Sequence, residues 1–268
     1  MEQIPLGGIV THGLNTSSLA DADPMLQTDG IHWLFSKEVY NPTRRVMLDG
    51  WSMVGQTENS VMYQFPAGGS SPGKAIVAYR GTQTLDDIKS DIQLSIPGGN
   101  CNFDAWKPEM QMIQDFITAN EDMTVELTGH SLGGAIARCV GSKLGLRVVT
   151  FNAAAPPSNP VVSNANEVDY HIVFDLISAW QTPNTVRLDK GIRPAPYSRL
   201  PLRFLRNNLP QLLEAHSIDL FSNKKPTLNL FTPNQESLLI QVWVNSLPWL
   251  YRKAFSTFIG TSNLPPVE

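Results

Sequence analysis

The chain has 268 residues, 42% of them hydrophobic and 16% charged, so it can bury a full-sized core within one domain. Its formal net charge of −4 offers no broad positive field for a phosphate backbone, which argues against a nucleic-acid partner. The two cysteines, Cys101 and Cys139, stand in no short Cys/His cluster, so neither a zinc site nor a disulfide framework is indicated. We expect two free thiols.

The sequence shows neither a targeting pattern nor a membrane-spanning one. The first thirty residues carry aspartates and no basic stretch ahead of an apolar run, so they do not resemble a secretory signal, which favours an intracellular location. The most apolar window, Leu238 to Tyr251, is interrupted by polar residues and Pro248. It is too short and too polar to span a bilayer.

The first half of the chain predicts a helix, a hairpin, a buried strand and an amphipathic helix, in that order. Residues 31–40 form a short apolar stretch that ends before Pro42, typical of a helix. Residues 51–54 and 61–65 indicate the two strands of a hairpin. Residues 74–80 are β-formers without alternation, which is typical of a strand buried on both faces. Apolar residues at three- and four-residue spacing between 104 and 120 predict a helix whose methionines pack in the core.

A strand, a helix and a second strand follow at residues 123–128, 135–143 and 147–151, and Gly145 closes the helix. Strand, helix and strand in this order predict parallel pairing through a right-handed crossover. We therefore expect one α/β domain over residues 1–268, with a mostly parallel central sheet flanked by helices.

The segment Gly129-His130-Ser131-Leu132-Gly133 contains a Gly-x-Ser-x-Gly motif. In this motif the serine stands on a sharp strand-to-helix turn that exposes its hydroxyl, and only small neighbours fit there. Here the motif follows an apolar strand and opens a helix rich in alanine and glycine, which is the context that the motif requires. The sequence predicts Ser131 as a nucleophile.

A serine nucleophile needs a histidine base, which in this kind of fold follows the serine and an acid in the chain. Of the five histidines, two lie upstream of the motif, His130 is the motif's variable residue, and His171 precedes the expected acid within an apolar strand. His216 remains as the candidate base.

The acid should lie between the serine and the base. Asp175 ends the strand at residues 171–174, which places it at the carboxyl edge of a parallel sheet, where the sites of α/β proteins lie. Asp189 ends a later strand and is the alternative. Glu167 and Asp169 are expected to be solvated residues at the entry to a strand.

Attack on an ester creates an oxyanion, which needs preorganised donors. One donor should be the backbone N–H of Leu132, directly after the nucleophile. The second should come from Thr82, in the loop after the buried strand that ends at Arg80, although an ordinary turn there is the alternative.

Three motifs together resemble the class 3 lipases, a family of fungal triacylglycerol lipases and related phospholipases and esterases with the α/β-hydrolase fold. They are Tyr79-Arg80-Gly81-Thr82, Thr128-Gly129-His130-Ser131-Leu132-Gly133-Gly134 and Phe151-Asn152-Ala153. The resemblance implies that Thr82 belongs to an oxyanion hole, that Ser131 is the nucleophile, and that Asp175 and His216 complete a triad. It covers roughly residues 31–220, which leaves residues 221–268 as an extension packed on the core.

The sequence departs from that family's pattern in two places. Asn102 to Trp106 stands where the family commonly has a Val-His-x-Gly-Phe stretch, and Asn152 replaces a usual glycine. These changes concern the acyl pocket and the substrate class. Leu85 to Ile92 matches the family's lid position and is either a lid or the start of a solvated helix.

Two further stretches carry apolar and aromatic residues beside basic ones, a composition that suits a lipid surface. They are Leu200 to Arg206 and the window around Trp243 and Trp249. For the second, a helix packed on the core is the favoured interpretation.

The sequence thus predicts a serine lipase or carboxylic-ester hydrolase that acts on acylglycerol-type lipids through an acyl-enzyme, without cofactor or metal. Its partners would be a lipid or small ester and, peripherally, a lipid surface. The alternatives are a phospholipase or non-lipid esterase with the same triad, or a catalytically silent lipid-binding or structural protein on this fold.

Overall fold

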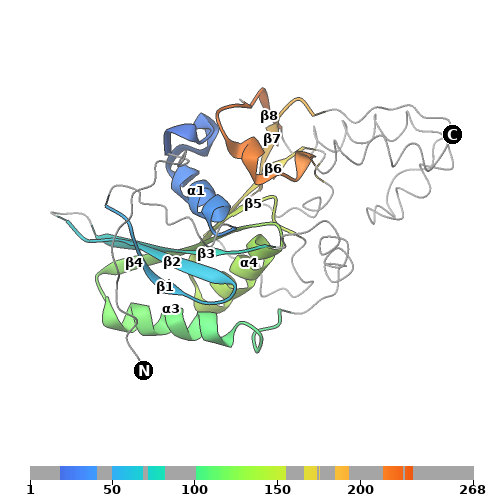
Figure 1. The fold of residues 1–268 in the computed structure, drawn as a ribbon. Coiled ribbons are helices and arrows are strands. Elements are labelled where there is room, and N and C mark those ends of the chain that lie inside the picture. Colours follow the sequence, from blue (N-terminus) through green and yellow to red (C-terminus); the bar gives the residue numbers. More distant parts are fainter. Residues whose placement is uncertain are drawn as a thin grey trace.

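The computed structural model describes residues 19–40, 50–68, 72–81, 101–154, 166–173, 175, 185–192, 214–225 and 227–231. In these residues a central eight-stranded sheet has helix α1 on one face and helices α3 and α4 on the other (Figure 1). The strands are β1 (Ser52–Gln56), β2 (Ser60–Phe65), β3 (Gly73–Tyr79), β4 (Met123–His130), β5 (Arg147–Phe151), β6 (Glu167–Ile172), β7 (Thr185–Asp189) and β8 (Asn229–Phe231). The helices are α1 (Gly30–Glu38), α3 (Lys107–Ala119) and α4 (Leu132–Leu144), with 3₁₀ helices η1 (Leu19–Asp21), η2 (Pro24–Asp29) and η4 (Ile218–Phe221).

The sheet is mostly parallel, as predicted. Strands β1 and β2 form an antiparallel hairpin that continues into β3, and β3 to β7 then pair in parallel. Strand β8 lies within the expected C-terminal extension and pairs antiparallel with β7, which adds an edge strand. Helix α4 begins at Leu132, three residues earlier than expected, because the glycines at 133 and 134 belong to its first turn and not to a loop.

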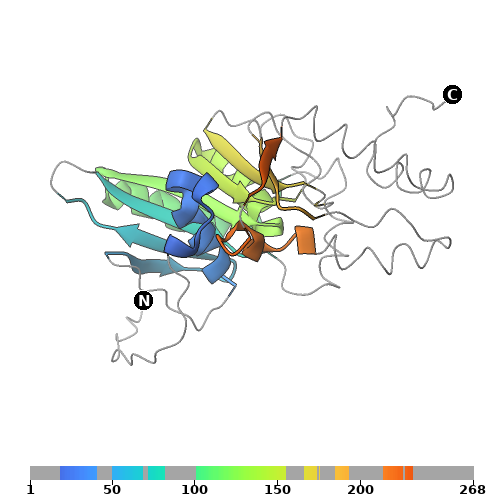
Figure 2. The ribbon, with the colours of Figure 1, turned by 90° about the horizontal axis from the view of Figure 1, so that it is seen from above.

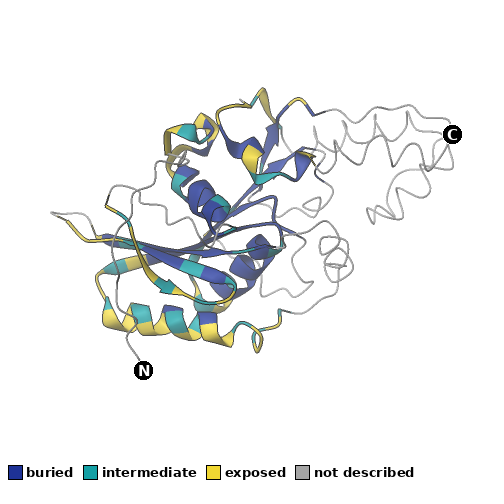
Figure 3. Cartoon of the chain, in the orientation of Figure 1, coloured by how far each residue is buried: buried dark blue, intermediate teal, exposed yellow. Residues whose placement is uncertain are grey.

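The core lies on both faces of the sheet, and Figure 3 shows that most residues of α1 and α4 are buried. Neighbouring residues along a strand point to opposite faces. Val149 and Phe151 therefore meet Trp33 of α1, whereas Val148 packs on the α4 side with Val140. The Nε1–H of Trp33 also donates to the Ile218 carbonyl at 2.9 Å. Helix α1 and η4 are thus in contact with each other on the same face of the sheet (Figure 2).

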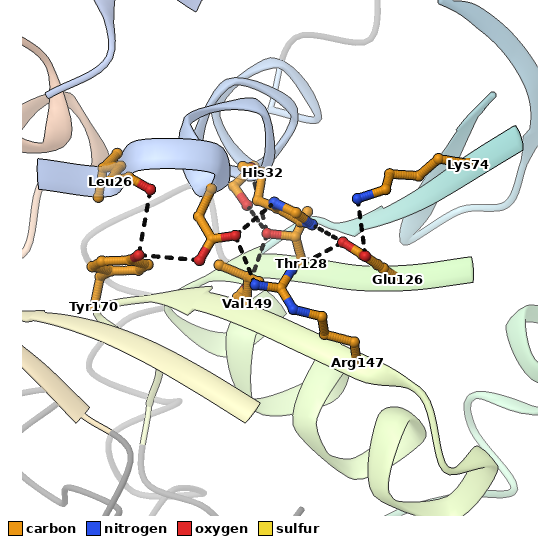
Figure 4. Close-up of polar contacts among 10 residues, drawn as sticks. Leu26, His32, Lys74, Glu126, Thr128, Arg147, Val149 and Tyr170 are labelled. Atoms are coloured by element: carbon orange, nitrogen blue, oxygen red, sulfur yellow. Dashed lines mark hydrogen bonds and ion pairs between the residues drawn. The ribbon is translucent and has the colours of Figure 1, made fainter. Parts of the chain in front are cut away.

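A network of charged side chains joins the start of α1 to β3, β4 and β5 (Figure 4). Glu126 Oε2 lies 2.7 Å from His32 Nε2 and 2.9 Å from Arg147 Nη1, and its Oε1 lies 3.0 Å from Lys74 Nζ. Arg147 Nη2 reaches Asp29 Oδ1 at 2.7 Å. Burial opposes the charged carboxylate, but these donors outweigh it and hold the pKa of Glu126 at about 2.

Glu167 and Asp169 are buried, so the expectation that they are solvated is wrong. Glu167 pairs with Val148 and Asp169 with Thr150, and both carboxylates point toward α4. Arg138 of α4 places its Nε 2.5 Å from Glu167 Oε1, and the Thr150 hydroxyl donates to Asp169 Oδ1 at 2.7 Å. An arginine in the helix that follows the Ser131 turn therefore supplies the partner that the local sequence does not reveal.

The expectation of two free thiols is also wrong, because Cys101 and Cys139 form a disulfide bond. Cys139 is buried in α4, and the segment that leads into α3 brings Cys101 to it across a sequence separation of 38 residues. Spacing alone could not reveal this pair, since the contact depends on how α3 and α4 share one face of the sheet.

Among the described residues, no helix is long and apolar enough to cross a membrane. The segments Leu85 to Ile92 and Leu200 to Arg206, and the window around Trp243 and Trp249, lie outside the described residues. Their expected roles at a lid or a lipid surface stay predictions.

The buried Glu167 should make stability fall with rising pH. Burial raises the pKa of Glu167 to about 7, the nearby Arg138 opposes this rise, and Asp169 adds to it. Between its ordinary value of 4.5 and about 7, the folded chain keeps a proton that the unfolded chain has lost. The Glu167 contribution to the free energy of unfolding should therefore decrease across this window, by up to about 3 kcal/mol. Urea unfolding of wild type and Glu167→Gln across this range checks it, and parallel pH profiles would contradict it.

The disulfide bond should stabilise the fold. Closing a loop of this length restricts the unfolded chain by about 3–4 kcal/mol in the chain-entropy model. We expect a reductant to lower the urea midpoint of the wild-type chain, whereas the midpoint of a Cys101→Ala/Cys139→Ala double variant should not respond to it. Identical wild-type midpoints with and without reductant would show that the bond does not form.

Candidate active site

Ser131 occupies a sharp turn between the last residue of β4 and the first residue of α4. Its backbone has φ 58° and ψ −129°, a left-handed conformation that costs a non-glycine residue about 1–3 kcal/mol. Backbone hydrogen bonds hold the turn in place: Ser131 N–H donates to the Phe151 carbonyl at 3.3 Å, and Ala154 N–H donates to the Ser131 carbonyl at 3.0 Å. The hydroxyl thus stands at the carboxyl edge of the sheet, as the motif predicts.

The two glycines of the motif permit this turn through close backbone contact. A Cβ atom on Gly129 would come closer than 3.0 Å to the backbone of Gly133, a separation that real Cβ atoms essentially never show. A Cβ on Gly133 would collide with the backbone of Tyr79 and Gly81. Any larger residue at either position would push α4 away from β4 or from the end of β3.

The structure brings Ser131, His216 and Asp175 together. Ser131 Oγ lies 2.8 Å from His216 Nε2, and His216 Nδ1 lies 2.9 Å from Asp175 Oδ2. The three residues are 5%, 4% and 2% exposed. Because a carboxylate only accepts, Nδ1 carries the proton, which leaves Nε2 free to accept the proton of the serine hydroxyl. This geometry permits the serine to act as a nucleophile with a local base.

Asp175, and not Asp189, lies against the histidine. Asp175 follows β6 by three residues, at the same sheet edge as Ser131. Asp189 is the last residue of β7, where its Oδ1 accepts the N–H of Gly191 at 2.8 Å.

Of the two expected oxyanion donors, Leu132 lies at the start of α4. Leu132 is the first residue of α4, and the first N–H groups of a helix have no partner within it. Thr82 lies outside the described residues. Its neighbour Gly81 lies against the turn, since a Cβ there would fall 2.7 Å from the His130 carbonyl oxygen. Within the part of the chain that the structure describes, no three His, Cys, Asp or Glu side chains gather to hold a metal ion.

Two further residues, neither of them predicted as part of the triad or the oxyanion hole, lie beside the triad. His130 is buried, and its Nε2 lies 2.6 Å from the carbonyl oxygen of His216. Asn152 has no exposed surface, and its Nδ2–H donates to the Ala215 carbonyl at 2.8 Å. The sequence holds two signals for these residues. One is a histidine at the end of a buried strand, and the other is an asparagine in a position where glycine is usual.

Several solved structures are similar to this chain. A fungal lipase shares 12% identity over 72% of this chain and 94% of its own, with a TM-score of 0.47. A triacylglycerol lipase from Penicillium expansum shares 16% identity over 64% and 82%, with a TM-score of 0.45. The Rhizomucor miehei lipase in complex with its propeptide shares 16% over 70% and 78%, with a TM-score of 0.44. A comparison with curated proteins gives no match.

The family model of the Tle-like phospholipase domain, described as phospholipase-like, matches residues 32–186 of this chain. These residues contain the Ser131 turn and strands β1 to β6, and they make up more than half of the 268 residues. The strand pairing confirms the predicted α/β architecture with a mostly parallel central sheet, and the family model confirms the expected membership of a lipase-like family. The chain belongs to the Tle-like phospholipase domain family.

Proposed function

We propose that this chain hydrolyses the carboxylic esters of lipids, with Ser131 as nucleophile, His216 as general base and acid, and Asp175 as the group that orients His216. One observation carries the proposal: His216 lies within hydrogen-bonding distance of Ser131 Oγ on one ring nitrogen and of Asp175 on the other. Membership of a phospholipase-like family supports a lipid as the substrate.

In the proposed reaction, Ser131 Oγ attacks the ester carbonyl carbon while His216 Nε2 takes the hydroxyl proton. The backbone N–H of Leu132 and a donor from Thr82 stabilise the oxyanion that forms. Collapse of this intermediate breaks the ester bond, and His216 gives its proton to the departing alcohol. Water then attacks the acyl-enzyme, gives a proton to His216 and releases the fatty acid, and the proton returns to Ser131.

Two lipid classes share this acyl ester bond. An acylglycerol is the substrate that the sequence motifs suggest, and the family description favours the acyl ester of a phospholipid as the second candidate. Fatty-acid release from acylglycerol emulsions and from phosphatidylcholine vesicles, compared at equal ester concentration, would separate them.

Replacing the nucleophile should abolish turnover and leave the fold intact. We expect Ser131→Ala to lower kcat on a short-chain nitrophenyl ester by at least about 10⁴-fold, because the covalent route is lost. It should also escape labelling by a fluorophosphonate that labels the wild-type chain. Ser52→Ala, at an exposed position of β1, is the matched control and should behave as wild type. Undiminished hydrolysis by Ser131→Ala would defeat the proposal, and a wild-type chain inert toward both probes would favour the silent alternative.

The two candidate acids should respond differently to the same change. Asp175→Asn should lower kcat by about 10⁴-fold, since an amide favours the wrong tautomer of His216. Asp189→Asn keeps an oxygen that can accept the Gly191 N–H, so its kcat should stay within about threefold of wild type. Steady-state kinetics on both variants decide between them, and the reverse order of effects would make Asp189 the acid.

A further inference from the structure

The backbone around His216 is held by side chains from three other parts of the fold. The Ala215 carbonyl accepts from Asn152 Nδ2 at 2.8 Å, and the His216 carbonyl accepts from His130 Nε2 at 2.6 Å. The Ile218 carbonyl accepts from Trp33 Nε1 at 2.9 Å. In the described part of this segment, Glu214 and Ala215 are helical and η4 begins at Ile218, so these donors hold the residues around His216 that lie between the two helical stretches.

Asn152 connects two segments that meet at the catalytic edge of the sheet. It follows β5 with a positive φ of 45°, which asparagine tolerates better than most residues. Its Oδ1 accepts the N–H of Ile172, at the end of β6, at 2.9 Å. Because the oxygen takes that N–H, the amide nitrogen must face the Ala215 carbonyl. The orientation of this amide is therefore fixed, and it ties the strand that leads to Asp175 to the segment that carries His216.

His130 is fixed as a neutral donor. A carbonyl oxygen only accepts, so Nε2 carries the proton, and Nδ1 then accepts the Tyr40 hydroxyl at 3.0 Å. Burial lowers the pKa of His130 to about 3, and the neighbouring His216 adds to the effect. The ring therefore stays neutral and keeps one orientation at neutral pH.

We propose that Asn152 and His130 are positioning residues that clamp the backbone at Ala215 and His216, so that His216 Nε2 stays directed at Ser131 Oγ. This inference rests on the proposed function. Each side chain bonds a main-chain carbonyl, Asn152 that of Ala215 and His130 that of His216. The His130 ring also lies against the His216 ring, with the ring centroids 4.7 Å apart. The 2.8 Å contact between Ser131 and His216 depends on that main chain, and a misplacement of about 1 Å in a catalytic group costs up to about a hundredfold in rate.

Variants of Asn152 test the first half of this clamp. Asn152→Gly suits the positive φ but removes the side-chain bonds to Ile172 and Ala215, and Asn152→Ala removes the same two bonds without adding a charge. Both should lower kcat about ten- to a hundredfold on a short-chain nitrophenyl ester, with KM within about twofold. The rate of fluorophosphonate labelling should fall in parallel.

Variants of His130 test the second half and provide a rescue. His130→Leu removes the donor and should lower kcat about ten- to a hundredfold, whereas His130→Gln can place an N–H near the former Nε2 and should recover most of the rate. Ser222→Ala is the matched control, because it removes a hydrogen bond to the Asp219 carbonyl in the same part of the chain without touching the clamp. Its kcat should equal that of wild type.

Thermal unfolding of each variant shows whether it is folded. If the Asn152 or His130 variants do not fold, Tyr40→Phe removes the hydroxyl that bonds His130 Nδ1, together with its 3.3 Å contact to the His130 carbonyl, and should lower kcat about threefold or more. Suppose that hydrolysis still requires Ser131 but that kcat is unchanged in Tyr40→Phe or in every folded clamp variant. This result would overturn the clamp and would leave the proposed hydrolase function standing. Hydrolysis that does not require Ser131 would overturn the proposed function and, with it, the clamp.

Discussion

The passage of the chain from β4 into α4 at Ser131 is the constraint on which the rest of the structure depends. A serine at φ 58° is held only because Gly129 and Gly133 let two backbones approach closely, and because Phe151 and Ala154 bond the turn from the β5 side. The same contacts bring the end of β3 against the start of α4. The strained turn therefore fixes where the carboxyl ends of three neighbouring strands meet, and Ser131 Oγ meets His216 Nε2 at that point.

The polar groups of this fold serve two purposes at different places. Under α1, opposite charges on Glu126, Arg147 and Asp29 pair with one another and fasten the helix to the sheet. Four residues further along β4, His130 is neutral and donates a single, directed hydrogen bond to a carbonyl. A charged side chain there would stand beside His216 and alter how readily that ring accepts a proton. A neutral donor fixes the geometry without this electrostatic effect.

Much of the fold could be predicted because its signals are local. The continuous apolar run of β3, the periodicity of α3 and the glycine-flanked Ser131 each depend on neighbours in the sequence. What could not be predicted depends on partners far along the chain. The disulfide of Cys101 joins segments 38 residues apart, and Glu167 is buried because Arg138 reaches it from α4. Chain order made His216 the candidate base. No local pattern could show that the His216 carbonyl accepts a hydrogen bond from His130, which lies 86 residues earlier.

Asn152 shows how a departure from a family pattern can be understood physically. A glycine in this position would adopt the positive φ at little cost and would leave the Ile172 N–H and the Ala215 carbonyl without this partner. The asparagine bears some backbone strain, but its amide satisfies both groups in a place that water does not reach. The sequence alone suggested that this change concerns the acyl pocket. The side-chain oxygen and nitrogen of Asn152 each form a hydrogen bond with a main-chain group. The exchange of glycine for asparagine therefore bears directly on the position of the proposed base, His216.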